Sequence, residues 1–114
     1  MNERGSAAVE FALVIPAIVL VLLAVTEVVV VARTQLELAQ AAREGARVAA
    51  IAADPAQAVT ATRTALGSMA ADATVTVDRP YVVGEAARVV IRLPMRVFGL
   101  PITLKADAAM RVES

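Results

Sequence analysis

Residues 11–32 read FALVIPAIVLVLLAVTEVVVVA, and this apolar run decides the fold. Of its 22 residues, only Pro16, Thr26 and Glu27 are not apolar. An α-helix of this length rises about 33 Å, which matches a bilayer hydrocarbon core of roughly 30 Å. The 15 Val, Ile, Leu and Phe residues contribute about −5 to −9 kcal/mol to insertion, against about +3 kcal/mol for one charged residue at the helix centre. We therefore expect residues 6–32 to form a transmembrane helix.

A cleaved secretory signal is the competing interpretation of this run. The apolar region of such a signal is about 7–15 residues long and precedes a small-residue cleavage site. Here the run is longer and continues directly into Arg33. The sequence therefore favours a membrane helix that stays in the protein.

The basic residues that flank the run bear on its orientation. Arg4 precedes it, whereas Arg33, Arg43 and Arg47 follow it. By the positive-inside rule alone, the carboxyl-terminal part of the chain would lie in the cytoplasm.

The composition argues against several function classes. The 114 residues suffice for one small domain, and 11 basic and 11 acidic residues give zero net charge, whereas a nucleic-acid-binding domain needs a basic surplus. Cysteine and histidine are absent, which removes the commonest general base and metal ligand. A cap, a turn or a strand face accounts for each of Asp54, Asp72, Asp78 and Asp107, and their spacing does not indicate acid–base catalysis. We expect no enzyme, no cofactor, no metal site and no nucleic-acid partner.

A lone carboxylate, Glu10, stands at the start of the apolar run, five residues after Gly5. An ionisable group at the edge of a membrane is costly and is a functional hypothesis by default. A cut after Gly5 would make Ser6 the amino terminus and place its ammonium about one helical turn from Glu10. The alternative is that Glu10 lies just inside the interface and reaches water.

Residues 33–53 read as a continuation of the helix into water, because they are rich in alanine and contain no proline. A stripe at helical spacing would be buried, and it comprises Leu36, Ala39, Ala42, Ala46, Ala49 and Ala53. Gly45 costs about 1 kcal/mol in a helix interior and indicates close backbone packing. That packing partner is either the protein's own domain or another subunit.

The rest of the chain predicts a second helix and three strands. Asp54 and Pro55 suit the cap and first position of a helix over residues 55–69. Apolar and polar residues then alternate over residues 73–78, 88–93 and 102–113. The fold class is therefore α+β: a transmembrane helix that continues outside the membrane, a second short helix, and a small three-stranded antiparallel sheet.

A hairpin turning at residues 98–101 would place Arg92 opposite Asp107. Pro94 opposes this pairing, because proline cannot donate to a strand ladder. In the alternative, the strand ends at Leu93, and the following residues form a loop that is tucked under the sheet or contacts lipid headgroups or a neighbouring subunit.

The chain resembles the TadE-like proteins of the tight-adherence (Flp-type) pilus system, which are small pseudopilins. Residues 4–16, RGSAAVEFALVIP, resemble the processing site and first membrane turns of that family. Glu27 lies where the family often has an acidic residue, and residues 41–47, AAREGAR, resemble its post-membrane helix signature. The resemblance is most specific over residues 4–51.

The resemblance implies that a prepilin peptidase cuts after Gly5 and leaves Ser6 as the mature amino terminus. Glu10 then has the charge-pairing role of the fifth mature residue, followed by Phe11. The implied domains are a leader (1–5), a transmembrane helix (6–32), a helix extension (33–53) and an extracytoplasmic α+β module (54–114). Further candidate subunit contacts are Glu27, Arg43, Glu44, Gly45 and Arg47.

The expected function is that of a minor pilin-like subunit or an assembly factor of a tight-adherence type IV pilus, with a role in cell adhesion. Its expected partners are the prepilin peptidase, other pilin or pseudopilin subunits, the assembly machinery and membrane lipid. Its expected place is the bacterial inner membrane, crossed once, with the amino terminus cytoplasmic and the remainder outside; entry into the fibre is left open. The alternative is an uncleaved single-pass protein whose outer module binds a partner.

Overall fold

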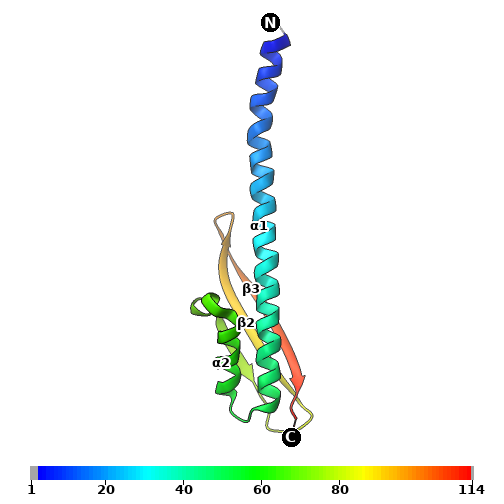
Figure 1. Ribbon diagram of the computed structural model, residues 1–114, viewed down its shortest axis with the longest axis vertical. Coiled ribbons are helices and arrows are strands. Elements are labelled where there is room, and N and C mark those ends of the chain that lie inside the picture. The colour runs from blue at the N-terminus through cyan, green and yellow to red at the C-terminus, as the bar shows by residue number, and fades with distance from the viewer. Residues whose placement is uncertain (1–2, 114) are drawn as a thin grey trace. The chain divides into compact units, whose positions relative to one another are not determined.

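The computed structural model describes residues 3–113, and the first two residues of the expected leader, Met1 and Asn2, lie outside the described part. The elements, in chain order, are α1 (Glu3–Ile51), α2 (Pro55–Leu66), a 3-10 helix (Gly67–Ala71), β1 (Thr74–Asp78), β2 (Ala86–Val97) and β3 (Leu100–Arg111) (Figure 1). This order confirms the predicted α+β class. The chain divides between Ala32 and Arg33 into an amino-terminal unit and a carboxyl-terminal unit.

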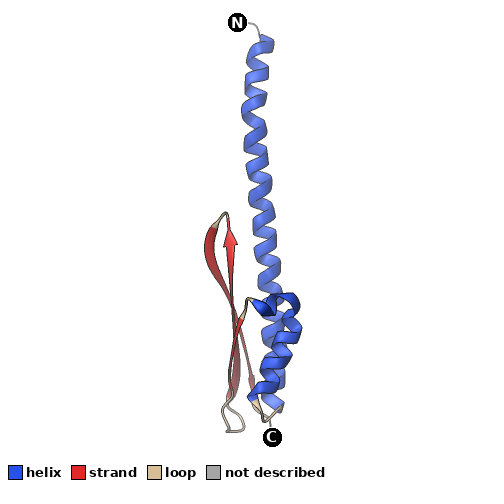
Figure 2. Cartoon of the chain, turned by 90° about the vertical axis from the view of Figure 1, so that its left-hand side faces the viewer, coloured by secondary structure: helices blue, strands red, loops and turns tan. Residues whose placement is uncertain are grey.

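The carboxyl-terminal unit has two layers. Its antiparallel sheet has the strand order β1-β2-β3, and Figure 2 shows the sheet as one layer beside the two helices. One core cluster joins α1 to the sheet through Leu38, Ala42, Ile91 and Ala106, among others. A second, smaller cluster comprises Ala49, Ala58, Ala87 and Val112. Because alanine dominates the helix side of both clusters, the backbone of α1 approaches the sheet closely.

The buried face of α1 differs in phase from the predicted stripe. Leu36 is 63% exposed, whereas Leu38 is fully buried. Ala42, Ala46 and Ala49 are buried as expected. The prediction for Leu36 was wrong because alanines occur on several faces of this helix and define its buried face only weakly. Leu36 and Leu38 lie on nearly opposite sides, and the packing of the sheet against the helix decides which of them is buried. The helix also ends at Ile51, two residues before the predicted end.

Helix α2 begins as predicted and ends earlier. The Asp54 side chain accepts a hydrogen bond from the Ala56 amide at 2.9 Å, which caps the helix. The helix ends at Leu66, because Gly67 has a φ of +61° and its amide donates to the carbonyls of Arg63 and Thr64. Met69, which was predicted to end this helix, lies instead in the 3-10 helix.

The β2–β3 hairpin turns on two residues instead of the predicted four. Val97 pairs with Leu100, and the residues between them, Phe98 and Gly99, have φ values of +52° and +75°. Positive φ at both central positions is typical of a type I′ turn, whose twist fits a hairpin. The shorter loop shifts the register by two residues.

The shifted register changes the predicted ion pair. Arg92 lies opposite Lys105, so the predicted Arg92–Asp107 pairing is wrong. Asp107 instead forms an ion pair with Arg88 at 3.7 Å between two exposed side chains. An exposed pair of this kind contributes about 0–1 kcal/mol.

Pro94 does not end β2, which continues to Val97. Hydrogen-bonded and non-hydrogen-bonded pairs alternate along the hairpin, starting with the hydrogen-bonded pair Val97–Leu100 at the turn. Pro94 and Thr103 therefore form a non-hydrogen-bonded pair. The proline nitrogen therefore faces away from β3, toward the side where β1 has already ended, since β1 pairs only as far as Arg92. Proline is tolerated at such an open position.

The carboxyl end of α1 is held by residues far along the chain. The Arg79 Nε donates to the Ala49 carbonyl at 2.7 Å, and the Glu113 amide donates to the Ala50 carbonyl at 2.9 Å. The last carbonyls of a helix have no partner within it, and a cation there also interacts favourably with the helix dipole. These two bonds attach the end of α1 to the loop after β1 and to the carboxyl terminus.

Replacing Arg79 with alanine is expected to destabilise the carboxyl-terminal unit by about 1.5–2 kcal/mol, because a partly buried carbonyl loses a charged donor. This loss of stability is measured by unfolding the full chain with urea in detergent and monitoring the unfolding by hydrogen exchange of the β2 amides. Arg111→Ala removes the same charge from an exposed position and is expected to change stability by less than about 0.5 kcal/mol. Equal stabilities of the two variants would contradict the assignment.

Candidate functional site

The amino-terminal unit consists of the first part of α1, and its apolar side chains are exposed around the whole helix. Phe11, Leu13 and Leu20 are 67%, 71% and 66% exposed. By length and composition, α1 is long and apolar enough to cross a membrane, and its most apolar stretch is not buried against the rest of the chain. A helix that is apolar on all sides is stable only when something covers it, and a lipid bilayer does so.

Glu10 begins a ridge of side chains on this helix. Successive positions four residues apart lie one above the other on a helix surface, and from Ser6 this series runs through Glu10, Val14, Ile18 and Leu22. Ser6 is half-buried and Glu10 is exposed. The structure therefore places the two residues of the expected processing and pairing site on the same face of one helix.

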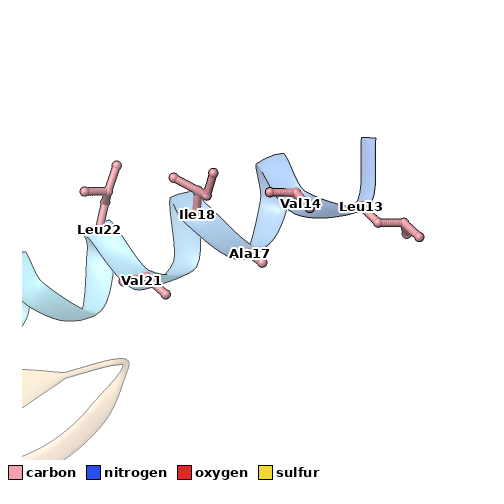
Figure 3. A pocket seen from close by; sticks show the side chains of 6 residues that line it. All are labelled: Leu13, Val14, Ala17, Ile18, Val21 and Leu22. Carbon is pink, nitrogen blue, oxygen red and sulfur yellow. The ribbon is translucent and has the colours of Figure 1, made fainter. Parts of the chain in front are cut away.

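A shallow groove runs beside this ridge. Its lining residues are Leu13, Val14, Ala17, Ile18, Val21 and Leu22. Figure 3 shows Val14, Ile18 and Leu22 along one side and Leu13, Ala17 and Val21 along the other. Two such ridges with a groove between them fit a ridge of another helix, and a small residue such as Ala17 allows its close approach. The sequence analysis did not predict this groove, although its six residues follow two series at spacings of four along the helix.

Glu27 and Thr26 are the other polar residues of the run. The Thr26 hydroxyl donates to the Leu22 carbonyl at 2.8 Å, which satisfies it within the helix. Glu27 is half-buried by its neighbours. It lies 17 positions after Glu10 in the same helix, about 26 Å along its axis, so the two acids are not brought together.

The predicted contact residues after the membrane run separate into an exposed group and a buried one. Arg47 binds the Glu44 carboxylate with both Nε, at 3.2 Å, and Nη2, at 2.5 Å. The hydrogen bond from Arg47 lowers the pKa of Glu44 and raises the pKa of Arg47. Arg43 is exposed on the neighbouring surface. Residues 43, 44 and 47 thus present a charged patch whose carboxylate stays ionised.

Gly45 is buried, and its contacts are internal to the carboxyl-terminal unit. A Cβ built on it would overlap the Thr62 hydroxyl oxygen and approach the Val89 Cγ1 to 3.3 Å. Thr62 is itself fully buried, and its hydroxyl donates to the Ala58 carbonyl at 2.7 Å. Gly45 therefore allows α1 to contact α2 and β2 at once.

Between residues 3 and 113, no three acidic side chains come close enough together to hold a metal ion. The amino-terminal unit carries an acid near a helix end and an apolar groove, and small and apolar side chains along such a groove suit association with other helices in a membrane.

The family model described as TadE-like protein matches residues 5–47. The matched residues include Gly5, Glu10, Glu27 and the stretch 41–47. No curated protein and no solved structure matches the chain. The resemblance to the TadE-like family is therefore confirmed over residues 5–47, and these residues include the apolar run of the candidate membrane helix.

Proposed function

We propose that the chain is a minor pilin-like subunit or assembly factor of a tight-adherence pilus, anchored in the inner membrane after cleavage by a prepilin peptidase. The observation that carries the proposal is the position of Glu10 on the same ridge as Ser6, within the TadE-like segment. The proposed role is structural, with no catalysis by this chain.

Cleavage after Gly5 is supported by local helix physics. Gly5 lies in the first turns of α1, where helices fray, and glycine is among the weakest helix formers. A peptidase that binds an extended substrate can therefore unwind residues 3–6 at low cost. The apolar run that follows would hold this bond at the membrane surface.

Cleavage also changes the electrostatics of the helix end. The new ammonium on Ser6 lies one turn from the Glu10 carboxylate, in the same subunit or in a neighbour. A carboxylate in lipid is costly without a partner, and pairing with an ammonium removes much of that cost. Pairing between subunits would also favour one axial register of adjacent helices.

Assembly would use two surfaces. Within the membrane, the groove beside Ala17 accepts a neighbouring helix, with Glu10 at its amino-terminal end. Outside the membrane, Arg43, Glu44 and Arg47 would offer polar contacts to another subunit. Near the far end of the apolar run, Glu27 would add a weaker contact by pairing with Arg33 of an adjacent chain. Gly45 serves the internal packing that holds these residues in place.

Topology follows from the processing site and not from the arginine count. A peptidase that acts on the cytoplasmic side requires the amino terminus to start inside, so the carboxyl-terminal unit lies outside. Reporter fusions at the carboxyl end decide between the two orientations: an alkaline phosphatase fusion is expected to be active and a green fluorescent protein fusion dark. The reverse result would reject the proposed orientation.

Deletion of the gene tests the function itself. Pili counted by electron microscopy of the deletion strain are expected to be absent, and the wild-type gene supplied on a plasmid is expected to restore them. Sheared-fibre and membrane fractions then separate a fibre subunit from an assembly factor. Normal pili in the deletion strain would contradict the proposal and favour an uncleaved single-pass protein that binds another partner.

A further inference from the structure

The outer end of the β2–β3 hairpin carries an apolar surface that the sheet does not cover. Beyond Leu93 the hairpin continues without β1, and Figure 2 shows it extending past the end of α2. Phe98 and Leu100 are 59% and 66% exposed, so the expectation that this segment is tucked under the sheet is wrong for both. Met95, Val97 and Ile102 are half-buried beside them. We call residues 95–102 the hairpin tip.

The opposite face of the same hairpin is basic. Arg92 and Arg96 on β2 and Lys105 on β3 lie on this face and are exposed. Arg92 and Lys105 lie directly opposite each other across the two strands. Like charges in that arrangement repel, and an anionic surface would relieve the repulsion. The hairpin thus combines an apolar end with flanking cations, the composition of a segment that lies at a membrane surface.

The direction of the hairpin follows from contacts within the carboxyl-terminal unit. Ala87 packs in the same cluster as Ala49, near the end of α1, whereas Leu93 packs in the cluster of Leu38. The Gln35 Nε2 donates to the Lys105 carbonyl at 2.8 Å. Strand β2 therefore runs back toward the start of this unit.

The hairpin tip consequently lies at the end of the unit where Arg33 is located. Between Lys105 and Leu100 the strand covers about 17 Å, so the tip extends well past the level of Gln35. Arg33 is joined by one peptide bond to Ala32, the last residue of the membrane run. That end of the unit is therefore the one that adjoins the apolar run along the chain.

We infer that the hairpin tip is a second membrane contact: Phe98 and Leu100 enter the interface, and Arg92, Arg96 and Lys105 bind anionic lipid headgroups. This contact rests on the membrane anchoring proposed above and adds a function to the sheet. It would restrict tilting of the carboxyl-terminal unit and present residues 43, 44 and 47 to a neighbour in a fixed orientation.

Single-cysteine labelling tests the inference, because the chain has no cysteine of its own. Leu100→Cys, Val83→Cys and Leu20→Cys replace side chains of similar exposure, 66%, 61% and 66%. They lie at the tip, in the loop between β1 and β2, and inside the membrane run. Each full-length variant carries an environment-sensitive fluorophore and is reconstituted at low protein density into vesicles of phosphatidylcholine and phosphatidylglycerol that contain a headgroup-level or acyl-chain nitroxide lipid.

The Leu20 label is expected to be quenched by the acyl-chain nitroxide, the Leu100 label by the headgroup-level nitroxide, and the Val83 label by neither. Arg92→Gln with Arg96→Gln is expected to weaken quenching of the Leu100 label in anionic vesicles to the level in pure phosphatidylcholine. If the Leu100 label behaves like Val83 while Leu20 is quenched, the tip inference fails and the membrane anchor stands. An unquenched Leu20 label would reject the anchor. If the Leu100 label is unquenched at low protein density and becomes inaccessible to solvent only at high protein density, the tip contacts a second copy of the chain and not lipid, which would overturn the inference.

Discussion

Replacing Glu10 with alanine is expected to abolish assembly while leaving membrane insertion intact. The substitution leaves an ammonium on Ser6 without its carboxylate at the helix end. Breaking a buried ion pair costs about 3–5 kcal/mol, which corresponds to a loss of more than about a hundredfold in association at each subunit contact. The measurement is the amount of pili on cells that carry the variant as their only copy of the gene, together with the variant protein in the membrane fraction.

The matched control is Glu27→Ala, which removes the same charge from the same helix. Glu27 lies near the far end of the run, so its loss is expected to leave most pili in place. Glu10→Asp keeps the charge on a shorter side chain and is expected to retain partial assembly. Wild-type levels of pili with Glu10→Ala would show instead that this carboxylate reaches water at the interface and needs no partner.

Replacing Gly45 with alanine is expected to destabilise the carboxyl-terminal unit by about 1–3 kcal/mol, the usual cost of overpacking a core. In an exposed helix, replacing glycine with alanine changes stability in the opposite direction and stabilises the helix by up to about 1 kcal/mol. The difference arises because the new methyl group would overlap the hydroxyl of Thr62, which is buried and bonded to Ala58. The change in stability is measured by unfolding the full chain with urea in detergent and monitoring the unfolding by hydrogen exchange of the β2 amides.

A second substitution separates steric overlap from other causes. Thr62→Ala removes the overlapping oxygen, so the double variant Gly45→Ala with Thr62→Ala is expected to be more stable than the sum of the two single changes predicts. The coupling between two residues in contact is typically about 0.5–3 kcal/mol. Simple additivity, or a single variant as stable as the wild type, would contradict the proposed packing of α1 against α2.

The elements with strong local signals were predictable from the sequence. The apolar run has the length of a bilayer, Asp54 and Pro55 mark a helix start, and period-two alternation identifies the strands. Register was not predictable, because it depends on the length of the hairpin loop. The turn requires positive φ at Phe98, and a bulky residue there gives no warning of a type I′ turn.

The candidate site was predictable where residues act through spacing along one helix. Ser6 and Glu10 share a face because they lie four positions apart, and any helix of this sequence places them so. Contacts between distant segments carried no such signal. The bond from Arg79 to the Ala49 carbonyl joins residues 30 positions apart, and the role of Gly45 depends on Thr62 in another helix.

The most direct test of the account is the mass of the mature amino terminus of the protein purified from its native membrane. Mass spectrometry is expected to find a chain that begins at Ser6, whose ammonium is then available to Glu10. A functional chain that retains residues 1–5 would contradict the central claim, because no new positive charge would stand beside the carboxylate.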